Sequence, residues 1–250
     1  MKDRINNFLR RFGYEVRKAP ISVSGLQVEA DFFKKHTWIK KKGFQTILDV
    51  GANKGQFAAR FRVLFPNAHI YSFEPIPEVY LNLSRRFDKD PHFTAFNLGL
   101  GASPGEFDFH LNQFSDSSSL LPMKSLHMES FPFTQQSSLI KIRVETLDRL
   151  APAQIHLTGP ILIKIDVQGY EKNVILGGLQ TIKKASMLMV EVSFQELYEN
   201  QDSSEDTFSL LRELGFSYIG NYDQLLSPKD SSILQADAIF VNHSLCSELN

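Results

Sequence analysis

Residues 49–55 form the most distinctive chemical pattern of the chain: an apolar run ends in an acidic residue that two glycines follow. The run Thr46–Val50 predicts a buried strand, and the amphipathic pattern from Gln56 predicts a helix. A turn of this kind lets a nucleotide-like ligand approach bare backbone at a helix N-terminus. The spacing Asp-x-Gly-x-Asn-x-Gly differs from the glycine pattern that holds a pyrophosphate, and Asp49 suits a cationic or hydroxyl-bearing ligand.

A second acidic residue follows the next predicted strand. Glu74 lies 23 residues after Gly51, where a carboxylate can accept both hydroxyls of a ribose; the alternative is a helix cap before Pro75. Gly51 and Gly55 would let the ligand approach the backbone, and Asn53 would either cap the helix or contact the ligand. This pattern favours S-adenosylmethionine (SAM) as the cofactor over NAD.

Polar residues recur at the ends of five predicted strands, and in a parallel sheet these carboxyl ends meet along one edge. That edge is the predicted functional site, and its residues are Asp49, Glu74, Asn97, Asp166 and Glu191. Asp166 is the first candidate for a general base, and His110 and His127 are the second, although a lone histidine in a loop is more often a surface residue. No spacing indicates a metal site, and none is predicted.

Alternating strand and helix patterns from Thr46 onward predict the elements that position these residues. Such alternation indicates a parallel sheet with helices on both faces. The predicted strands are Thr46–Val50, His69–Phe73, Phe93–Leu98, Ile161–Val167, Met187–Val192, Phe216–Ile219 and Ala238–Val241.

An insertion at about residues 101–145 interrupts this alternation. Phe107–Leu111 and Ile140–Glu145 alternate apolar and polar residues and are predicted to pair as strands. The Ser-rich residues 112–138 between them form a functional loop or a disordered one, and the apolar bulk they carry favours a lid over the substrate.

Charge is distributed unevenly along the 250 residues. Residues 1–45 carry a net charge of +7 and the remainder −8, for a total of −1. We predict that residues 1–45 form a basic, mostly helical extension, either packed on the domain or in contact with membrane headgroups, nucleic acid or an acidic partner. With Cys246 as the single cysteine, a disulfide framework and a Cys-rich zinc site are excluded. No signal peptide or apolar membrane span is evident, which indicates a cytoplasmic protein.

Four motifs together resemble the FkbM family of SAM-dependent methyltransferases. They are Asp49–Gly55, Phe73–Pro75, Val144–Asp148 and Ile163–Glu171. The resemblance covers about residues 46–195, and the last motif is the most specific. Its usual form is K-I-D-V-E-G-x-E, and this chain has Gln168 where glutamate is common.

The resemblance implies a Rossmann-like class I methyltransferase fold over residues 46–250, with a mostly parallel seven-stranded sheet and a final antiparallel strand. It also implies methyl transfer to a hydroxyl of a saccharide, glycan or related metabolite. The cofactor-binding residues that it implies are Asp49, Gly51, Asn53 and Gly55 at the methionine end, Glu74 at the ribose, Asn97 and Leu98 at the adenine, Ser118 over the cofactor and Asp166 at its edge.

Two other functions remain open. A nucleic-acid methyltransferase would use the basic residues 1–45, but no Asn/Asp-Pro-Pro-Tyr sequence follows the fourth strand, where Asp166 stands. A non-catalytic nucleotide-binding module would have no need of both Asp49 and Glu74. An NAD-dependent oxidoreductase is disfavoured because the Gly-x-Gly-x-x-Gly pattern is missing. The oligomeric state is left open.

Overall fold

The computed structural model describes residues 21–23, 26–28 and 36–245. Most of the predicted basic extension, residues 1–45, and Cys246 lie outside these residues. Within the basic extension, β1 (Ile21–Val23) and β2 (Leu26–Val28) pair antiparallel, and α3 (Thr37–Lys40) follows. The described part of the extension thus contains two short strands and one short helix, and the prediction of a mostly helical extension stays a prediction.

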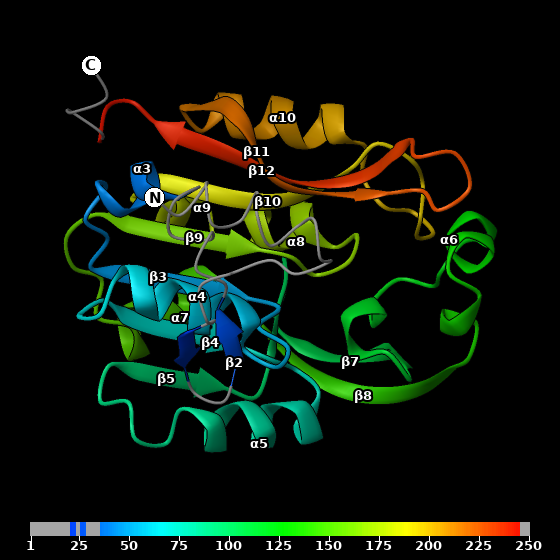
Figure 1. The fold of residues 1–250 in the computed structure, drawn as a ribbon, viewed down its shortest axis with the longest axis horizontal. Helices are drawn as coiled ribbons and strands as arrows, with labels where there is room; N and C mark the ends of the chain where they lie inside the picture. The colour runs from blue at the N-terminus through cyan, green and yellow to red at the C-terminus, as the bar shows by residue number, and fades with distance from the viewer. Residues whose placement is uncertain (1–20, 24–25, 29–35, 246–250) are drawn as a thin grey trace, which may run out of the picture.

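A seven-stranded sheet forms the centre of the molecule (Figure 1). Its strand order is β11-β12-β10-β9-β3-β4-β5; neighbours from β10 to β5 are parallel, and β12 is antiparallel to both β10 and β11. The predicted fold class is confirmed. The strands are β3 (Thr46–Val50), β4 (His69–Phe73), β5 (Phe93–Phe96), β9 (Ile161–Ile165), β10 (Met187–Ser193), β11 (Phe216–Leu226) and β12 (Ile233–Asn242).

The last two strands are much longer than the sequence predicts. Their pairing contains three register shifts, and most of β11 is exposed. A bulged, half-exposed ribbon loses the strict alternation by which a strand is predicted. The extra length carries Asp223 on β11 and Gln235 on β12 towards the ends of the parallel strands.

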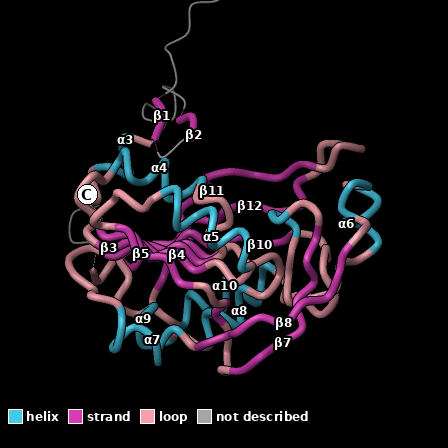
Figure 2. Tube along the Cα trace, turned by 90° about the horizontal axis from the view of Figure 1, so that it is seen from below, coloured by secondary structure: helices cyan, strands magenta, loops and turns pink. Residues whose placement is uncertain are grey.

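Helices cover both faces of the sheet (Figure 2). One layer contains α4 (Gln56–Leu64) and α5 (Pro77–Arg86), and its apolar core includes Phe61 and Leu83. The opposite core includes Val174 and Leu211. Its helices are α7 (Leu147–Gln154), α8 (Glu171–Leu176), α9 (Leu179–Ile182) and α10 (Ser204–Glu213).

The insertion forms a second, three-stranded sheet. β7 (Gly105–Asn112) pairs antiparallel with β8 (Ser137–Glu145), as the alternation predicts, and β6 (Gly99–Leu100) pairs parallel with β8. Residues 113–136, which we call the lid segment, lie between β7 and β8, on the side towards which the arrowhead of β9 points (Figure 1). Their short helices are η1 (Ser115–Ser117), α6 (Ser125–Ser130) and η2 (Pro132–Thr134).

The lid segment is packed onto the domain. Met123 and Phe131 pack against buried Leu197, Tyr198 and Leu234. Backbone hydrogen bonds tie Lys124 N to Leu197 O at 2.8 Å and Glu199 N to Pro122 O at 2.8 Å. The lid segment is thus an ordered part of the domain that covers the ends of the parallel strands. Among the described residues, no helix is long and apolar enough to cross a membrane.

Candidate active site

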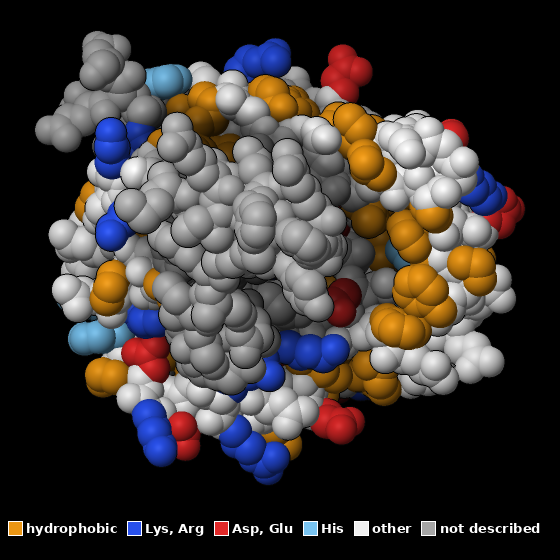
Figure 3. All heavy atoms as spheres, in the orientation of Figure 1, with side chains coloured by type: hydrophobic (Ala, Val, Ile, Leu, Met, Phe, Trp, Pro, Cys, Tyr) orange, Lys and Arg blue, Asp and Glu red, His pale blue; other side chains and the backbone are white. Residues whose placement is uncertain are grey.

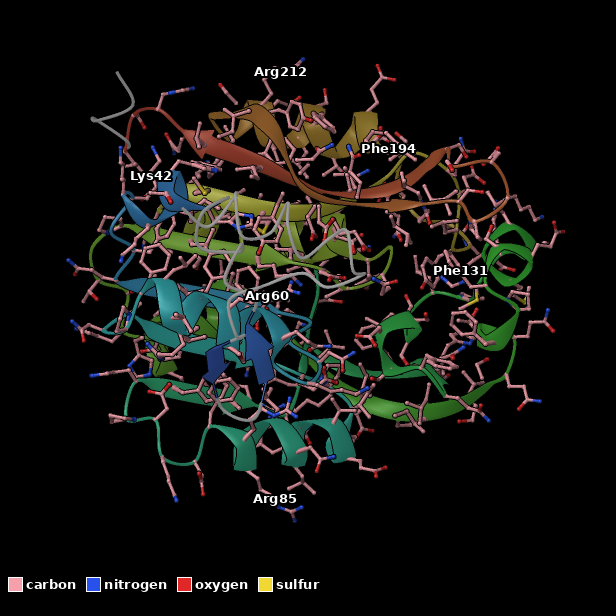
Figure 4. All side chains as sticks on the ribbon, viewed as in Figure 1. Lys42, Arg60, Arg85, Phe131, Phe194 and Arg212 are labelled. Atoms are coloured by element: carbon pink, nitrogen blue, oxygen red, sulfur yellow. The ribbon has the colours of Figure 1, made fainter. Side chains whose placement is uncertain are left out.

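A cavity of about 580 Å³ lies between the carboxyl ends of the parallel strands and the lid segment. Its floor includes Gly51, Glu74 and Asp166, which follow β3, β4 and β9. Hydrophobic side chains gather beside a recess on the right of the space-filling view (Figure 3). Phe131, labelled in Figure 4, belongs to the cavity wall and comes from the lid segment. The other aromatic lining residues are Phe73, Phe109, Phe114, His127 and Phe133.

The cavity is acidic. Among the described residues that line it, none is Lys or Arg, and the acids are Glu74, Asp116, Asp166, Glu191 and Asp223. Because an uncompensated charge is costly in a partly enclosed site, such a lining favours a cationic ligand or one that donates hydroxyl hydrogen bonds. An anionic pyrophosphate is disfavoured.

The glycine turn after β3 contacts the chain segment that carries Asp166. Gly51 has a φ of 79°, and a Cβ there would lie 1.8 Å from the carbonyl oxygen of Asp166. The backbone N–H groups of Gly51 and Ala52 both donate to Phe73 O. Gly51 therefore allows three strand ends to meet closely, a role that no residue with a Cβ could take.

Glu74 faces the cavity in a fixed orientation. Its Oε2 accepts a hydrogen bond from Asn53 N at 2.9 Å, and its Oε1 accepts one from Ile76 N at 2.8 Å. Burial raises the pKa of the Glu74 carboxyl to about 7. Asn97 donates its amide to the carbonyl oxygens of Glu74 and Pro75, each at 3.0 Å, and so braces this turn.

Gln168 is the centre of a polar cluster that also lines the cavity. Its Nε2 donates to Asp166 Oδ1 at 2.9 Å and to Glu191 Oε2 at 3.0 Å. Tyr198 donates its hydroxyl to Gln168 Oε1 at 2.8 Å, and Gln235 Nε2 donates to Glu191 Oε2 at 2.9 Å. The sequence analysis did not identify Gln168, Tyr198 or Gln235 as site residues. The only signal in the sequence was that Gln168 departs from the family motif.

A buried lysine supports this cluster from beneath. Lys164 Nζ donates to Asp166 Oδ2 at 2.8 Å. Burial lowers the pKa of Lys164, but the carboxyl groups of Asp166, Asp49 and Asp237 outweigh burial and hold it above its usual value. Asp49 stands opposite Lys164 across β3 and β9. It is wholly buried, its pKa is raised by burial to about 6, and it does not line the cavity.

The structure brings about half of the predicted site residues to the cavity, and their roles there stay predictions. The lining residues among them are Gly51, Asn53, Glu74, Ser118, His127 and Asp166, and the others are Asp49, Gly55, Asn97, Leu98 and His110. Gly55 adjoins Leu83 and Phe87, since a Cβ there would lie 2.7 Å from each side chain. Leu98 belongs to the core.

The two candidate histidines differ in their surroundings. His110 lies on β7 outside the cavity, and its backbone pairs with Ser119. His127 is buried in the lid segment, where its Nδ1 is 3.2 Å from Thr134 Oγ1. Burial lowers the pKa of His127 to about 4, so the imidazole is neutral near pH 7.

Two other predicted site residues form hydrogen bonds that hold the lid segment. Asn53 Nδ2 donates to Asp116 Oδ1 at 3.0 Å, and Ser118 Oγ accepts from Asn112 N at 2.9 Å.

Glu171 orders the loop between β9 and α8. Its Oε1 accepts hydrogen bonds from Val167 N at 3.0 Å and Gly169 N at 3.1 Å. This loop carries Gln168, whose φ of 57° is unusual for a residue with a side chain. Glu171 thus fixes the backbone on which the polar cluster depends.

Replacing Glu171 by Gln should stabilise the protein at alkaline pH. Burial raises the pKa of Glu171 from 4.5 to about 7. The stability that its protonated form contributes is fully present below the unfolded pKa and is lost as pH rises through about 7. Gln keeps both bonds, since both go to one oxygen. We expect nearly equal stability of Glu171→Gln and wild type near pH 4.5 and a gain of roughly 3 kcal/mol at pH 8.

Urea unfolding of both proteins at the two pH values measures this difference. Glu196→Gln is the matched control, because Glu196 is exposed and paired with Lys124 outside the cavity. A gain for Glu171→Gln that is the same at both pH values would contradict the assigned charge state.

No group of three or more His, Cys, Asp or Glu side chains suited to a metal ion occurs among the described residues.

The sheet order, the glycine turn after β3 and the acid after β4 define a class I methyltransferase. The sequence profile of the methyltransferase FkbM domain matches residues 49–218, and the chain belongs to this methyltransferase family. The predicted resemblance is confirmed, and the protein is a methyltransferase enzyme.

Two relatives and one solved structure illustrate the range of similar proteins. The 2-O-methyltransferase NoeI of Sinorhizobium fredii is 29% identical over 199 residues, 77% of this chain and 79% of NoeI. The hexuronic acid methyltransferase AglP of Haloferax volcanii is 26% identical over 145 residues, 58% of this chain and 54% of AglP. Fibrillarin of Aeropyrum pernix, solved with bound SAM, aligns with a TM-score of 0.44 and 11% identity over 80% of this chain and 66% of fibrillarin.

Proposed function

We propose that the protein is a SAM-dependent O-methyltransferase that acts on a hydroxyl group of a saccharide, glycan or related hydroxylated metabolite. One observation carries the proposal. A single cavity is lined both by the Gly51 turn and Glu74 and by the cluster of Asp166, Gln168 and Glu191. A cofactor site and an acceptor site must adjoin in this way for a group to pass between them.

The Gly51 turn and Glu74 fit SAM. The cofactor carries a sulfonium and an ammonium group, and the lining offers carboxyl groups without a described Lys or Arg. Glu74 would hold the ribose hydroxyls, the turn at Gly51 and Asn53 would hold the methionine end, and Ile76 and Leu100 offer an apolar wall for the adenine. When bound, SAM supplies a methyl group made electrophilic by the positively charged sulfur.

Asp166 is the proposed general base. It lines the cavity, and its carboxylate has the Lys164 ammonium at 2.8 Å as a cationic partner. A sugar hydroxyl is a weak nucleophile, so a carboxylate that accepts its proton would assist the reaction. The second carboxylate oxygen, Oδ1, is held by Gln168, which fixes the direction of the group.

The lid segment would exclude water from this cavity. Ser119 Oγ donates to Gln168 O at 2.6 Å, and Ser115 Oγ donates to Asn53 Oδ1 at 2.9 Å. The lid is therefore bonded both to the turn that carries Asn53 and to the loop that carries Gln168. Exclusion of water strengthens the electrostatic interactions inside and prevents competing hydrolysis.

A saccharide acceptor is supported by the lining and by the relatives. Gln168, Glu191 and Gln235 present amide and carboxyl groups suited to hydroxyls, while Phe131 and Phe133 offer aromatic surface. NoeI is a 2-O-methyltransferase, and AglP is a hexuronic acid methyltransferase. A small-molecule or glycan acceptor follows as the proposed partner.

Calorimetric titration with SAM, S-adenosylhomocysteine and NADH tests the cofactor. We expect dissociation constants on the order of micromolar for the first two and no heat from NADH. Mass spectrometry of methyl glycosides incubated with the protein and SAM then tests the acceptor, with a short RNA as the comparison. Binding of NADH alone, or methylation of RNA but of no glycoside, would refute the proposed function.

A further inference from the structure

Two carboxyl groups that line the cavity share one amide. Gln168 Nε2 donates to Asp166 at 2.9 Å and to Glu191 at 3.0 Å. Two ionised carboxylates so close together repel each other, and such pairs commonly keep one proton between them. The question is which of the two groups carries that proton.

The hydrogen-bond partners of the two groups differ in charge. Asp166 has the ammonium of Lys164 on Oδ2. Glu191 receives only neutral amides, from Gln168 and Gln235, and both donate to the same oxygen, Oε2. Oε1 of Glu191 has no hydrogen-bond partner among the described residues, and Glu191 lines the cavity. A proton on Oε1 would conflict with neither amide.

The charges that face Glu191 also favour its neutral form. Burial, followed by the neighbouring acids, raises its pKa well above the usual value, and Lys164 opposes this from β9. The phenol of Tyr198 lies on the far side of Gln168. The acids near Glu191 are Asp166 after β9, Glu171 on α8 and Asp237 on β12, and Asp223 on β11 lines the same pocket.

We propose that Glu191 is a neutral carboxylic acid at neutral pH and that its Oε1 hydroxyl donates a hydrogen bond to the acceptor, while Asp166 remains the carboxylate. Glu191 is then a specificity-determining residue for acceptors that offer a hydroxyl or ring oxygen next to the reacting hydroxyl. The nature of the bound ligand rests on the proposed function, whereas the charge state of Glu191 does not.

Gln should therefore reproduce Glu191 closely. Its Oε1 can accept from Gln168 and Gln235, and its Nε2 can donate into the cavity where the acid would. An ionised Glu191, in contrast, would be an acceptor there, and Gln would fail to replace it. The substitution Glu191→Gln thus distinguishes the two charge states, and Glu191→Ala removes the group altogether.

Infrared difference spectroscopy at neutral pH reads the charge state without any acceptor. The wild-type minus Glu191→Gln spectrum should contain the C=O stretching band of a protonated carboxyl group. The wild-type minus Glu196→Gln spectrum should contain the stretching bands of an ionised carboxylate only. Carboxylate bands in both spectra, with no C=O band of a protonated carboxyl group, would overturn the proposal. Failure of Glu191→Gln to fold would overturn it too, because the variant matches the proposed neutral group in shape and hydrogen bonding.

Calorimetric titration with neutral methyl glycosides, in the presence of S-adenosylhomocysteine, reads the role of the hydroxyl. We expect Glu191→Gln to retain affinity within about threefold and Glu191→Ala to lose about tenfold. Equal loss in both variants would overturn the donor role. Binding of S-adenosylhomocysteine without binding of any glycoside would refute the proposed acceptor class, and the infrared result would still decide the charge of Glu191.

Discussion

Asp166→Asn is expected to lower kcat by about 10²- to 10⁴-fold, the usual contribution of a general base, while the dissociation constant for SAM changes by less than about threefold. The carboxylate lines the cavity and is oriented by Lys164 and Gln168. Asn keeps the shape of the side chain but cannot accept the proton of a hydroxyl. Loss of turnover without loss of cofactor binding would separate the chemical role of Asp166 from a role in holding the cofactor.

Steady-state kinetics with a methyl glycoside that serves as acceptor and calorimetry with SAM measure these two quantities. Asp108→Asn is the matched control, because Asp108 is exposed on β7 and paired with Lys141. Asp166→Ala should recover part of its turnover when formate is added, which a purely structural role of Asp166 would not explain. Turnover of Asp166→Asn within about threefold of wild type would eliminate Asp166 as the base.

Glu74→Ala is expected to weaken SAM binding by about 100-fold, since an ionised acceptor of two hydroxyl hydrogen bonds is lost. The substitution also leaves the N–H groups of Asn53 and Ile76 without their acceptor. Glu74→Gln should be impaired as well, because its amide would direct a donor at one of these N–H groups. The unfolding midpoint, measured alongside, shows how much of the effect is structural.

The affinity of the wild type for SAM should rise with pH through the titration of Glu74. Burial raises the pKa of this carboxyl to about 7 in the ligand-free protein. The carboxylate is the stronger acceptor for ribose hydroxyls, so affinity should increase from pH 6 to pH 8. Calorimetry of wild type and Glu74→Gln at both pH values tests this. A pH dependence that persists unchanged in Glu74→Gln would assign it to another group.

The structure revises the expected result of deleting residues 112–138. If these residues acted only as the substrate lid that the sequence favours, their deletion would impair acceptor use more than folding. Met123 and Phe131, however, cover the buried side chains of Leu197, Tyr198 and Leu234. Exposing that surface would destabilise the domain itself. Point substitutions within the cavity are therefore the informative experiments.

The sequence by itself determined the alternation of strands and helices along the chain and the glycine turn after β3. It also determined the positions of Glu74 and Asp166 at strand ends. These follow from local periodicity and from the rule that parallel strands end at one edge. Such signals are carried by residues close together in the chain. The same rule placed Asp49 and Asn97 at that edge, but it could not tell whether their side chains face the cavity.

Only the tertiary structure decided how side chains distant in the sequence share hydrogen bonds. Asp166, Glu191 and Gln235 come from three different strands or their ends. Gln168 donates to both Asp166 and Glu191, and Gln235 donates to Glu191. The burial of His127 and the pairing of Asp49 with Lys164 arise in the same way. Hydrogen bonds and charge states depend on distances of a few ångströms and on burial, which no periodicity in the sequence encodes.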